Sequence, residues 1–290
     1  MTYEYAGDTH ETLVAAYRAD ESPFPTDDSR VYPRRDHLRD EPALLKRLLF
    51  PRCWNGTDLL DDRAAVRDEL TALGRCVYKG TTAYADRDAD AVAGVVDGLL
   101  DRLPAIRKRL KKDVEAAYKG DPAAKSYCEI IRSYPSFHAT LTHRVANELY
   151  AADHPEYARE LAEHAKVETG IDIHPGADIG DYFFIDHGTG VVIGETATVG
   201  DWARIYQNVT LGALHFEEAE GEEHMLAKDY KRHPDLGDHV VVGAGSNVLG
   251  AVEIGDHVSI GANAWVTDDV SDHTSVFVSE HPEQARKPTD

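Results

Sequence analysis

The sequence has few cysteines, no long hydrophobic run and a shortage of basic residues. Its three cysteines, Cys53, Cys76 and Cys128, are widely spaced and odd in number, which predicts neither a disulfide framework nor a zinc knuckle. A reducing compartment, the cytoplasm, is therefore expected. No apolar stretch reaches the roughly 18 residues of a transmembrane helix. The first residues show no basic and then apolar pattern, so no secretory signal is expected.

The charge of the chain is strongly biased toward acid. Its 290 residues carry 52 acidic and 31 basic side chains, a formal net charge of −21. Such a chain suits neither nucleic acid nor an anionic membrane as a partner, because both attract basic faces. The acidic residues are spread along the sequence, which predicts a solvated surface. We hypothesise a salt-rich host, in which their mutual repulsion is screened.

The first part of the chain has helical periodicity. Apolar residues recur at three-, four- and seven-residue spacings over 58–78 and 91–110, and a third such segment follows Ser136. Pro104 is expected near a helix start or at a kink. Residues 1–40 are polar and dotted with proline, so we expect a flexible N-terminal arm there. An α-helical domain is predicted over 41–165.

From Val167 onward the period changes to six. Aliphatic residues recur at every sixth position and are usually followed by glycine, which is a hexapeptide repeat. Three hexads form one coil of a parallel β-helix, whose aliphatic side chains fill a triangular prism. The sequence therefore predicts an α+β protein with a left-handed parallel β-helix over 166–275 and a short tail over 276–290. The repeated aliphatic residues are Ile173, Ile179, Ile185, Ile193, Val199, Ile205, Leu211, Leu236, Val242, Val248, Ile254, Ile260 and Val266.

Two breaks in the period mark candidate binding segments. The step from Ile185 to Ile193 is eight residues, and the extra residues fall at 186–190. The step from Leu211 to Leu236 is 25 residues, which predicts a loop excursion over 213–235. Segments that leave a regular scaffold are where binding residues usually lie.

His187 lies in the first break and is a candidate general base. An imidazole can take up a proton near neutral pH, and it needs a partner such as a carboxylate to orient its ring. Asp172 precedes His187 by fifteen residues, close to the length of one coil, so the two side chains could stack on adjacent coils. A surface histidine at a turn is the alternative reading of His187, and His174 is interpreted as mainly structural.

Arg232 and His233 end the second break. An arginine there suits a carboxylate, which it can hold through two parallel hydrogen bonds. In so acidic a chain, a loop arginine can equally pair with a neighbouring acid. A zinc site like that of the γ-class carbonic anhydrases also stays open, although no metal is expected. Its candidate ligands, whose spacing matches no ligand pattern, are His174, His187, His215, His224 and His233.

Several motifs together resemble serine O-acetyltransferase, a family of hexapeptide-repeat acyltransferases. The most specific is Asp186-His-Gly-Thr-Gly-Val-Val-Ile-Gly-Glu-Thr. The resemblance runs in order over roughly residues 121–267. It implies acetyl transfer from acetyl-CoA to the hydroxyl of L-serine, the first step of cysteine biosynthesis. The accompanying motifs are Gly120-Asp-Pro-Ala, Phe137-His-Ala, Asp172-Ile-His-Pro-Gly-Ala-Asp-Ile-Gly, Val209-Thr-Leu-Gly and Arg232-His-Pro.

The resemblance also implies roles for single residues. His187 matches the general base, and Asp172 matches the carboxylate that orients it. Asp121 and Asp186 match acids that contact serine. Arg232 and His233 match the pair that binds the serine carboxylate. The positions that correspond to CoA contacts are Ala213, Ala244, Gly245 and Ala262.

The resemblance further implies a homo-oligomer, either a trimer with active sites between neighbouring coils or a dimer of such trimers. Two departures stand out. The short glycine-rich stretch after Gly212 is replaced by Ala213-Leu-His-Phe-Glu-Glu, which affects the expected CoA contacts. The chain ends in Asp290 where the family commonly has isoleucine, so weak or absent docking of O-acetylserine sulfhydrylase is expected.

Other classes of function stay open at this point. A hexapeptide-repeat acyltransferase can act on another small hydroxyl or amine acceptor, and hexads alone fit that reading. A metal-dependent hydratase and a non-catalytic scaffold are the others. The scaffold is disfavoured because it needs no combination of His187, Asp172 and Arg232.

Overall fold

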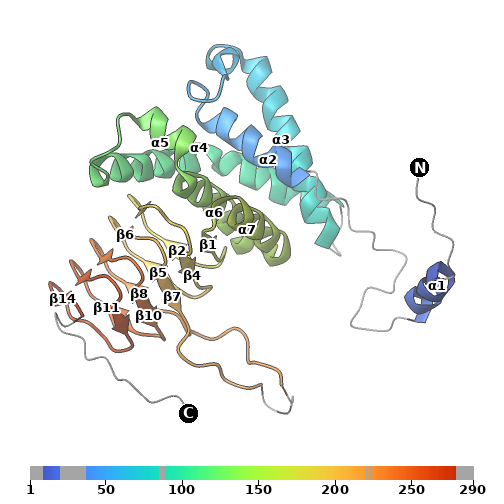
Figure 1. Ribbon diagram of the computed structural model, residues 1–290. Helices are drawn as coiled ribbons and strands as arrows, with labels where there is room; N and C mark the ends of the chain where they lie inside the picture. The colour runs from blue at the N-terminus through green and yellow to red at the C-terminus, as the bar shows by residue number, and fades with distance from the viewer. Residues whose placement is uncertain (1–8, 20–36, 85–88, 220, 222–223, 279–290) are drawn as a thin grey trace, which may run out of the picture.

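The computed structural model describes residues 9–19, 37–84, 89–219, 221 and 224–278. A group of helices covers one end of a triangular coil, and a long loop leaves the coil near its middle (Figure 1). The predicted fold, a helical region followed by a left-handed parallel β-helix, is confirmed. Within the described part, every helix is too short or too polar to cross a membrane.

The helical region is built from segments whose apolar residues recur on one face. Of the predicted N-terminal arm, residues 1–8 and 20–36 lie outside the described residues. Residues 37–40 already belong to a helix. The helices are α1 (Thr9–Ala19), α2 (His37–Leu49), the 3₁₀ helix η1 (Thr57–Leu60), α3 (Arg63–Tyr84), α4 (Ala89–Gly120), α5 (Tyr127–Ser133), α6 (Pro135–Ala151) and α7 (Pro155–Thr169).

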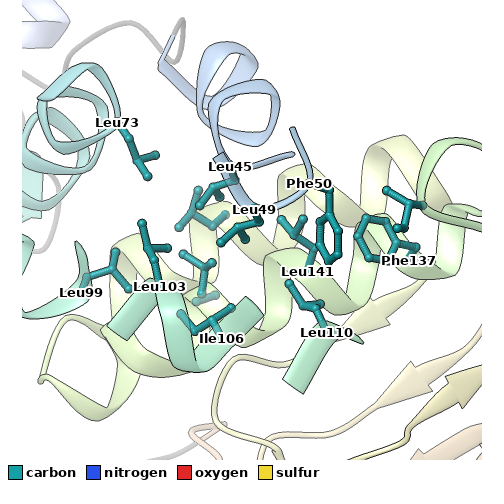
Figure 2. Close-up of a cluster of buried hydrophobic side chains, with 14 of the residues drawn as sticks. Leu45, Leu49, Phe50, Leu73, Leu99, Leu103, Ile106, Leu110, Phe137 and Leu141 are labelled. Carbon is teal, nitrogen blue, oxygen red and sulfur yellow. The ribbon is translucent and has the colours of Figure 1, made fainter. Parts of the chain in front are cut away.

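Leucine side chains from several helices meet in one core, which Figure 2 shows. Leu73 of α3, Leu103 of α4 and Leu141 of α6 are almost fully buried. Each buried leucine contributes about 1.5–3 kcal/mol relative to an exposed one. Pro104 lies inside α4, between the buried Leu103 and Ile106. Pro104 therefore does not lie near the start of α4, and the other expectation, a kink at Pro104, stays a prediction.

The coil consists of short parallel strands in three sheets. In every strand from β1 to β13 the repeated aliphatic residue is buried inside the prism. Sheet A contains β1 (Asp172–Ile173), β4 (Val192–Ile193), β7 (Thr210–Gly212), β10 (Asn247–Leu249) and β13 (Trp265–Val266). Sheet B contains β2 (Asp178–Ile179), β5 (Thr198–Val199), β8 (Asp235–Leu236) and β11 (Glu253–Ile254). Sheet C contains β3 (Phe184–Ile185), β6 (Arg204–Ile205), β9 (Val241–Val242), β12 (Ser259–Ile260) and β14 (Ser275–Val276).

The chain turns at three corners of the prism. We call the turn from sheet C to sheet A the first corner, from A to B the second, and from B to C the third. The first corner contains 186–191, and the second contains 194–197 and the long loop before β8. The third corner has aromatic rings stacked from coil to coil, with centroids 4.1–6.3 Å apart. These rings belong to Tyr182, Trp202, His239, His257 and His273.

A buried ion pair joins the helices to the first coil. The Arg144 guanidinium of α6 donates to both carboxylate oxygens of Asp113 in α4, at 2.7 and 2.8 Å. It also donates to the backbone carbonyls of Ile179 and Gly180 in the coil. Asp113 in turn accepts the backbone N–H of Phe183 at 3.0 Å. The pair therefore fixes α4 and α6 against the chain that leads into β3.

A disulfide bond links Cys53, in the turn after α2, to Cys128 in α5. The expectation that the cysteines form no disulfide is wrong. The two residues are 75 positions apart in the sequence, but α2 and α5 pack on α4 and bring their Cα atoms to 5.7 Å. Cys76 carries a free thiol. The spacing of the cysteines gives no sign of this pairing, because the pairing depends on helix packing.

Candidate functional site

Asp121, Asp186 and His187 gather where α4 ends above the first corner. Asp121 directly follows α4, and its carboxylate accepts the backbone N–H of Ala123 at 2.7 Å and the hydroxyl of Tyr134. The Tyr134 hydrogen bond is the main cause that lowers the pKa of Asp121. Asp186 and His187 follow β3, and the His187 Nε2 lies 3.8 Å from an oxygen of Asp186.

Charges couple these three side chains to one another. Burial raises the pKa of Asp186, the charge of His187 lowers it, and the charge of Asp121 raises it again. His187 adopts a left-handed backbone conformation with φ of 61°, and its side chain is 73% exposed. This φ is uncommon for a residue other than glycine, and the exposed fraction shows that the imidazole lies outside the buried coil. The group combines two carboxylates, which suit an ammonium ion, with an exposed imidazole that can accept a proton.

Asp172 lies at the start of β1 and forms an ion pair with Lys166 of α7. The distance from Lys166 Nζ to the carboxylate is 2.7 Å, and this hydrogen bond is the main cause that raises the pKa of Lys166. Among the described residues, Asp172 forms an ion pair with Lys166 alone. No hydrogen bond joins Asp172 to His187 there. The orienting role of Asp172 therefore stays a prediction.

Arg232 and His233 lie at the second corner, in a separate cluster. The Arg232 guanidinium pairs with the carboxylate of Glu195, which also accepts the hydroxyl of Tyr150 at 2.8 Å. His233 is buried, and its Nδ1 lies 3.1 Å from the backbone nitrogen of Thr196. Burial lowers the pKa of His233 to about 4, so its ring is neutral at neutral pH.

The two clusters are separated by one side of the prism. His187 precedes strand β4 of sheet A, and Glu195 follows that strand. Among the described residues, no hydrogen bond or ion pair connects Arg232 with His187, Asp186 or Asp121. Within a single chain, the structure thus brings together Asp121, Asp186 and His187, and it places Arg232 and His233 elsewhere.

The predicted CoA positions follow the first corner along the coil. Ala244 and Gly245 lie between β9 and β10, and Ala262 lies between β12 and β13. Backbone hydrogen bonds connect these turns, since Gly245 donates to Gln207 at 3.0 Å and Asn263 donates to Ala244 at 2.9 Å. Ala213 directly follows β7, where the long loop leaves the second corner. Three of the four positions therefore share a corner with His187.

Sequence reasoning missed the partners of the candidate residues. No motif points to Tyr134, although it lies next to Pro135 at the start of α6 and its hydroxyl donates to Asp121. Glu195 stands inside the most specific motif and pairs with Arg232. Lys166 lies six residues before Asp172, in the last turn of α7. The position of Glu195 within the motif is a signal in the sequence. Only the fold shows that Tyr134 and Lys166 contact the candidate residues.

Comparison with known proteins supports one family. Residues 79–142 match the family described as serine acetyltransferase, N-terminal, and residues 233–268 match the bacterial transferase hexapeptide family. A serine acetyltransferase of Staphylococcus epidermidis is 44% identical over 169 residues, which is 58% of this chain and 74% of the relative. The chain belongs to the serine acetyltransferase family. Its members are acyltransferases, so this chain is an enzyme of that class.

Other relatives of the serine acetyltransferase family agree. The plasmid serine acetyltransferase of Synechococcus elongatus is 52% identical over 168 residues. The aligned part is 58% of this chain and 52% of that relative, so the match spans about half of the relative's length. The crystal structure of serine acetyltransferase isoform 3 from Entamoeba histolytica, in complex with cysteine, has a TM-score of 0.75 at 41% identity. That match covers 97% of this chain and 94% of the other. Serine acetyltransferase 1 of the same organism, in complex with L-cysteine, has a TM-score of 0.77 at 41% identity and covers 92% of this chain and 96% of that one.

Proposed function

We propose that this chain transfers the acetyl group of acetyl-CoA to the hydroxyl of L-serine, giving O-acetyl-L-serine and CoA. Membership of the serine acetyltransferase family supports the reaction. The observation that carries the proposal is the group formed by Asp121, Asp186 and His187. Relatives have been solved in complex with cysteine, and a relative from Neisseria gonorrhoeae has been solved with serine.

His187 acts as the general base. A serine hydroxyl is a weak nucleophile, and it attacks efficiently only as its proton is removed. The imidazole takes that proton while the hydroxyl oxygen bonds to the thioester carbonyl carbon. The tetrahedral oxyanion then collapses, the carbon–sulfur bond breaks, and the proton held by His187 passes to the CoA thiolate. Asp172 orients the ring once its contact with Lys166 gives way to one with His187 Nδ1.

Asp121 and Asp186 recognise the ammonium group of serine. Asp121 is suited to this because the Tyr134 hydroxyl and the Ala123 N–H fix its carboxylate, and both contacts lower its pKa. Asp186 is partly buried, so its carboxylate is in contact with less water than an exposed one. A bound ammonium group compensates for that lost hydration. A site that recognises ammonium, carboxylate and hydroxyl together rejects analogues that lack one of these groups.

Arg232 and His233 bind the serine carboxylate from a neighbouring chain. On one chain they lie across a side of the prism from His187, at the opposite end of strand β4. A threefold assembly of coils brings the second corner of one chain to the first corner of the next. The outer residues of sheet A include Val192 and Trp265, which are 38% and 67% exposed, so an apolar contact surface is present on that side. Acetyl-CoA then lies along the first corner, beside Ala244, Gly245 and Ala262.

Thiol release from acetyl-CoA tests the reaction and the acceptor. With the full chain at low and at molar potassium chloride, we expect release that depends on L-serine. Homoserine, small amines and sugars serve as alternative acceptors in the same assay. Release with one of those acceptors and none with L-serine would leave an acyltransferase with another substrate.

Mixed oligomers test the shared site. Chains with His187→Ala and chains with Arg232→Ala are mixed, unfolded and refolded together, and they are assayed at a serine concentration at which each variant alone shows little turnover. In random trimers about a quarter of the sites combine an intact His187 with an intact Arg232 from the neighbour, so about a quarter of the activity returns. Each variant refolded alone is the control. If the mixture stays as inactive as the two controls, then both residues act within one chain.

A further inference from the structure

A cavity lies in the helical region, away from both clusters of the candidate site. It has a volume of about 520 Å³ and lies between α2, the turn after α2, and helices α6 and α7. We call it the α2–α7 cavity. Volumes of about 300–1,000 Å³ are usual for small-molecule sites. Its wall includes Lys46 of α2, Trp54 of the turn and His138 of α6.

Two buried ring nitrogens of this wall have no hydrogen-bond partner among the described residues, Trp54 Nε1 and His138 Nε2. An indole N–H can only donate, so it can be satisfied only by an acceptor. Burial, together with the nearby charges of Lys46 and His164, lowers the pKa of His138 to about 4. His138 is therefore neutral at neutral pH and carries one N–H. A buried donor that lacks an acceptor destabilises the folded chain, because it has lost its hydrogen bond to water.

The charged residues around the cavity leave an excess of positive charge. The Lys46 ammonium lies 5.2 Å from the centre of the Trp54 ring, and burial lowers the pKa of Lys46. Arg47 is neutralised by ion pairs with Asp58 and Glu69. Lys46 and Arg39 form no ion pair within the described part of the chain, and the one carboxylate of the cavity wall, Glu168, acts on Lys46 through its charge alone. In a chain with a net charge of −21, two such cations beside two unpartnered ring nitrogens are unusual.

We propose that the α2–α7 cavity binds a small organic anion whose carboxylate or phosphate oxygens accept hydrogen bonds from Trp54 and His138 and lie beside Lys46. A negative oxygen accepts the Trp54 N–H, it accepts an N–H from His138 when that ring carries its proton on Nε2, and it balances the charge of the ammonium. The cavity is larger than a bare ion, and its wall includes Pro42, Ala43 and the Trp54 ring, which suit an apolar body. His138 thereby gains a role that the proposed acetyl transfer does not give it.

Tryptophan fluorescence tests the site directly. In a Trp202→Phe/Trp265→Phe chain, Trp54 is the single tryptophan, since the sequence has three. This chain is titrated at constant ionic strength with potassium butyrate, potassium phenylphosphate and potassium chloride. A saturable change with butyrate identifies a carboxylate ligand, and one with phenylphosphate identifies a phosphate ester. Saturation with chloride alone, or with none of the three, would overturn the proposal.

Matched variants assign the response to the cavity. Lys46→Met should weaken the binding of the responding anion at least tenfold. Lys111→Met removes the same charge from an exposed position of α4 outside the cavity and should leave binding unchanged. Equal weakening by both substitutions would show general charge attraction and contradict a built site. If the double tryptophan substitution prevents folding, then anion-dependent thermal unfolding of the unsubstituted chain and of Lys46→Met gives the same comparison. Serine acetylation by Lys46→Met, measured in parallel, reports separately on the proposed function.

Discussion

Replacing Arg144 with methionine should strongly destabilise the contact between the helical region and the coil. The substitution removes two hydrogen bonds to Asp113 and the donors to two coil carbonyls, all in a buried setting. Asp113, which is 5% exposed, then keeps one described hydrogen bond, from the backbone of Phe183. Breaking a buried pair by removing one partner costs about 3–5 kcal/mol, because the other charge stays buried without compensation. We expect a loss of unfolding free energy of that size.

Urea unfolding at a fixed chain concentration measures this loss. The exposed pair of Arg102 with Glu148, at 3.1 Å and with the arginine side chain 60% exposed, provides the control. Arg102→Met should cost no more than about 1 kcal/mol, as exposed ion pairs do. Adding Asp113→Asn to Arg144→Met should recover part of the loss, because it removes the uncompensated charge. The reasoning is refuted if Arg144→Met costs no more than Arg102→Met, or if the second substitution adds a further full loss.

Two further predictions concern stability in the helical region. Burial raises the pKa of Glu41, whose carboxylate accepts the Tyr157 hydroxyl, from 4.5 to about 7. The protonated Glu41 side chain contributes its full stabilisation below pH 4.5, and this stabilisation is lost as the pH rises to about 7. Because glutamine carries no charge, Glu41→Gln should raise the unfolding free energy at pH 8 by up to about 3 kcal/mol. Stability curves of the two chains that stay parallel from pH 4.5 to 8 would contradict this. The Cys53–Cys128 bond closes a loop of 75 residues, and Cys128→Ser should cost about 4 kcal/mol. Unfolding of the unsubstituted chain with and without a reductant checks this prediction, and the substituted chain should not respond to the reductant.

The coil was predictable because the repeated aliphatic residue of each hexad marks the position that faces the interior. An aliphatic residue at every sixth place, such as Ile193 or Val242, has one inward direction in a triangular prism, and both are buried as expected. The helices were predictable as segments, but their packing was not. The Cys53–Cys128 bond depends on which helices meet.

The candidate site was predictable only in part, for a related reason. Asp186 and His187 are neighbours in the sequence, and the end of α4 brings Asp121 to them. The path of the long loop decides where Arg232 lies, and no periodicity describes that loop. The contact of Arg232 with Glu195 therefore appeared only in the structure. The sequence did allow a loop arginine that pairs with a nearby acid, without indicating which acid.

The role of His187 as general base is the central claim, and one comparison tests it most directly. Serine-dependent thiol release from acetyl-CoA is measured for the unsubstituted chain and for His187→Ala, together with CoA binding by calorimetry. We predict that turnover falls by about 10²–10⁴-fold in the variant while its affinity for CoA is unchanged. Turnover that survives the substitution, or a loss that is fully explained by weaker CoA binding, would contradict the account.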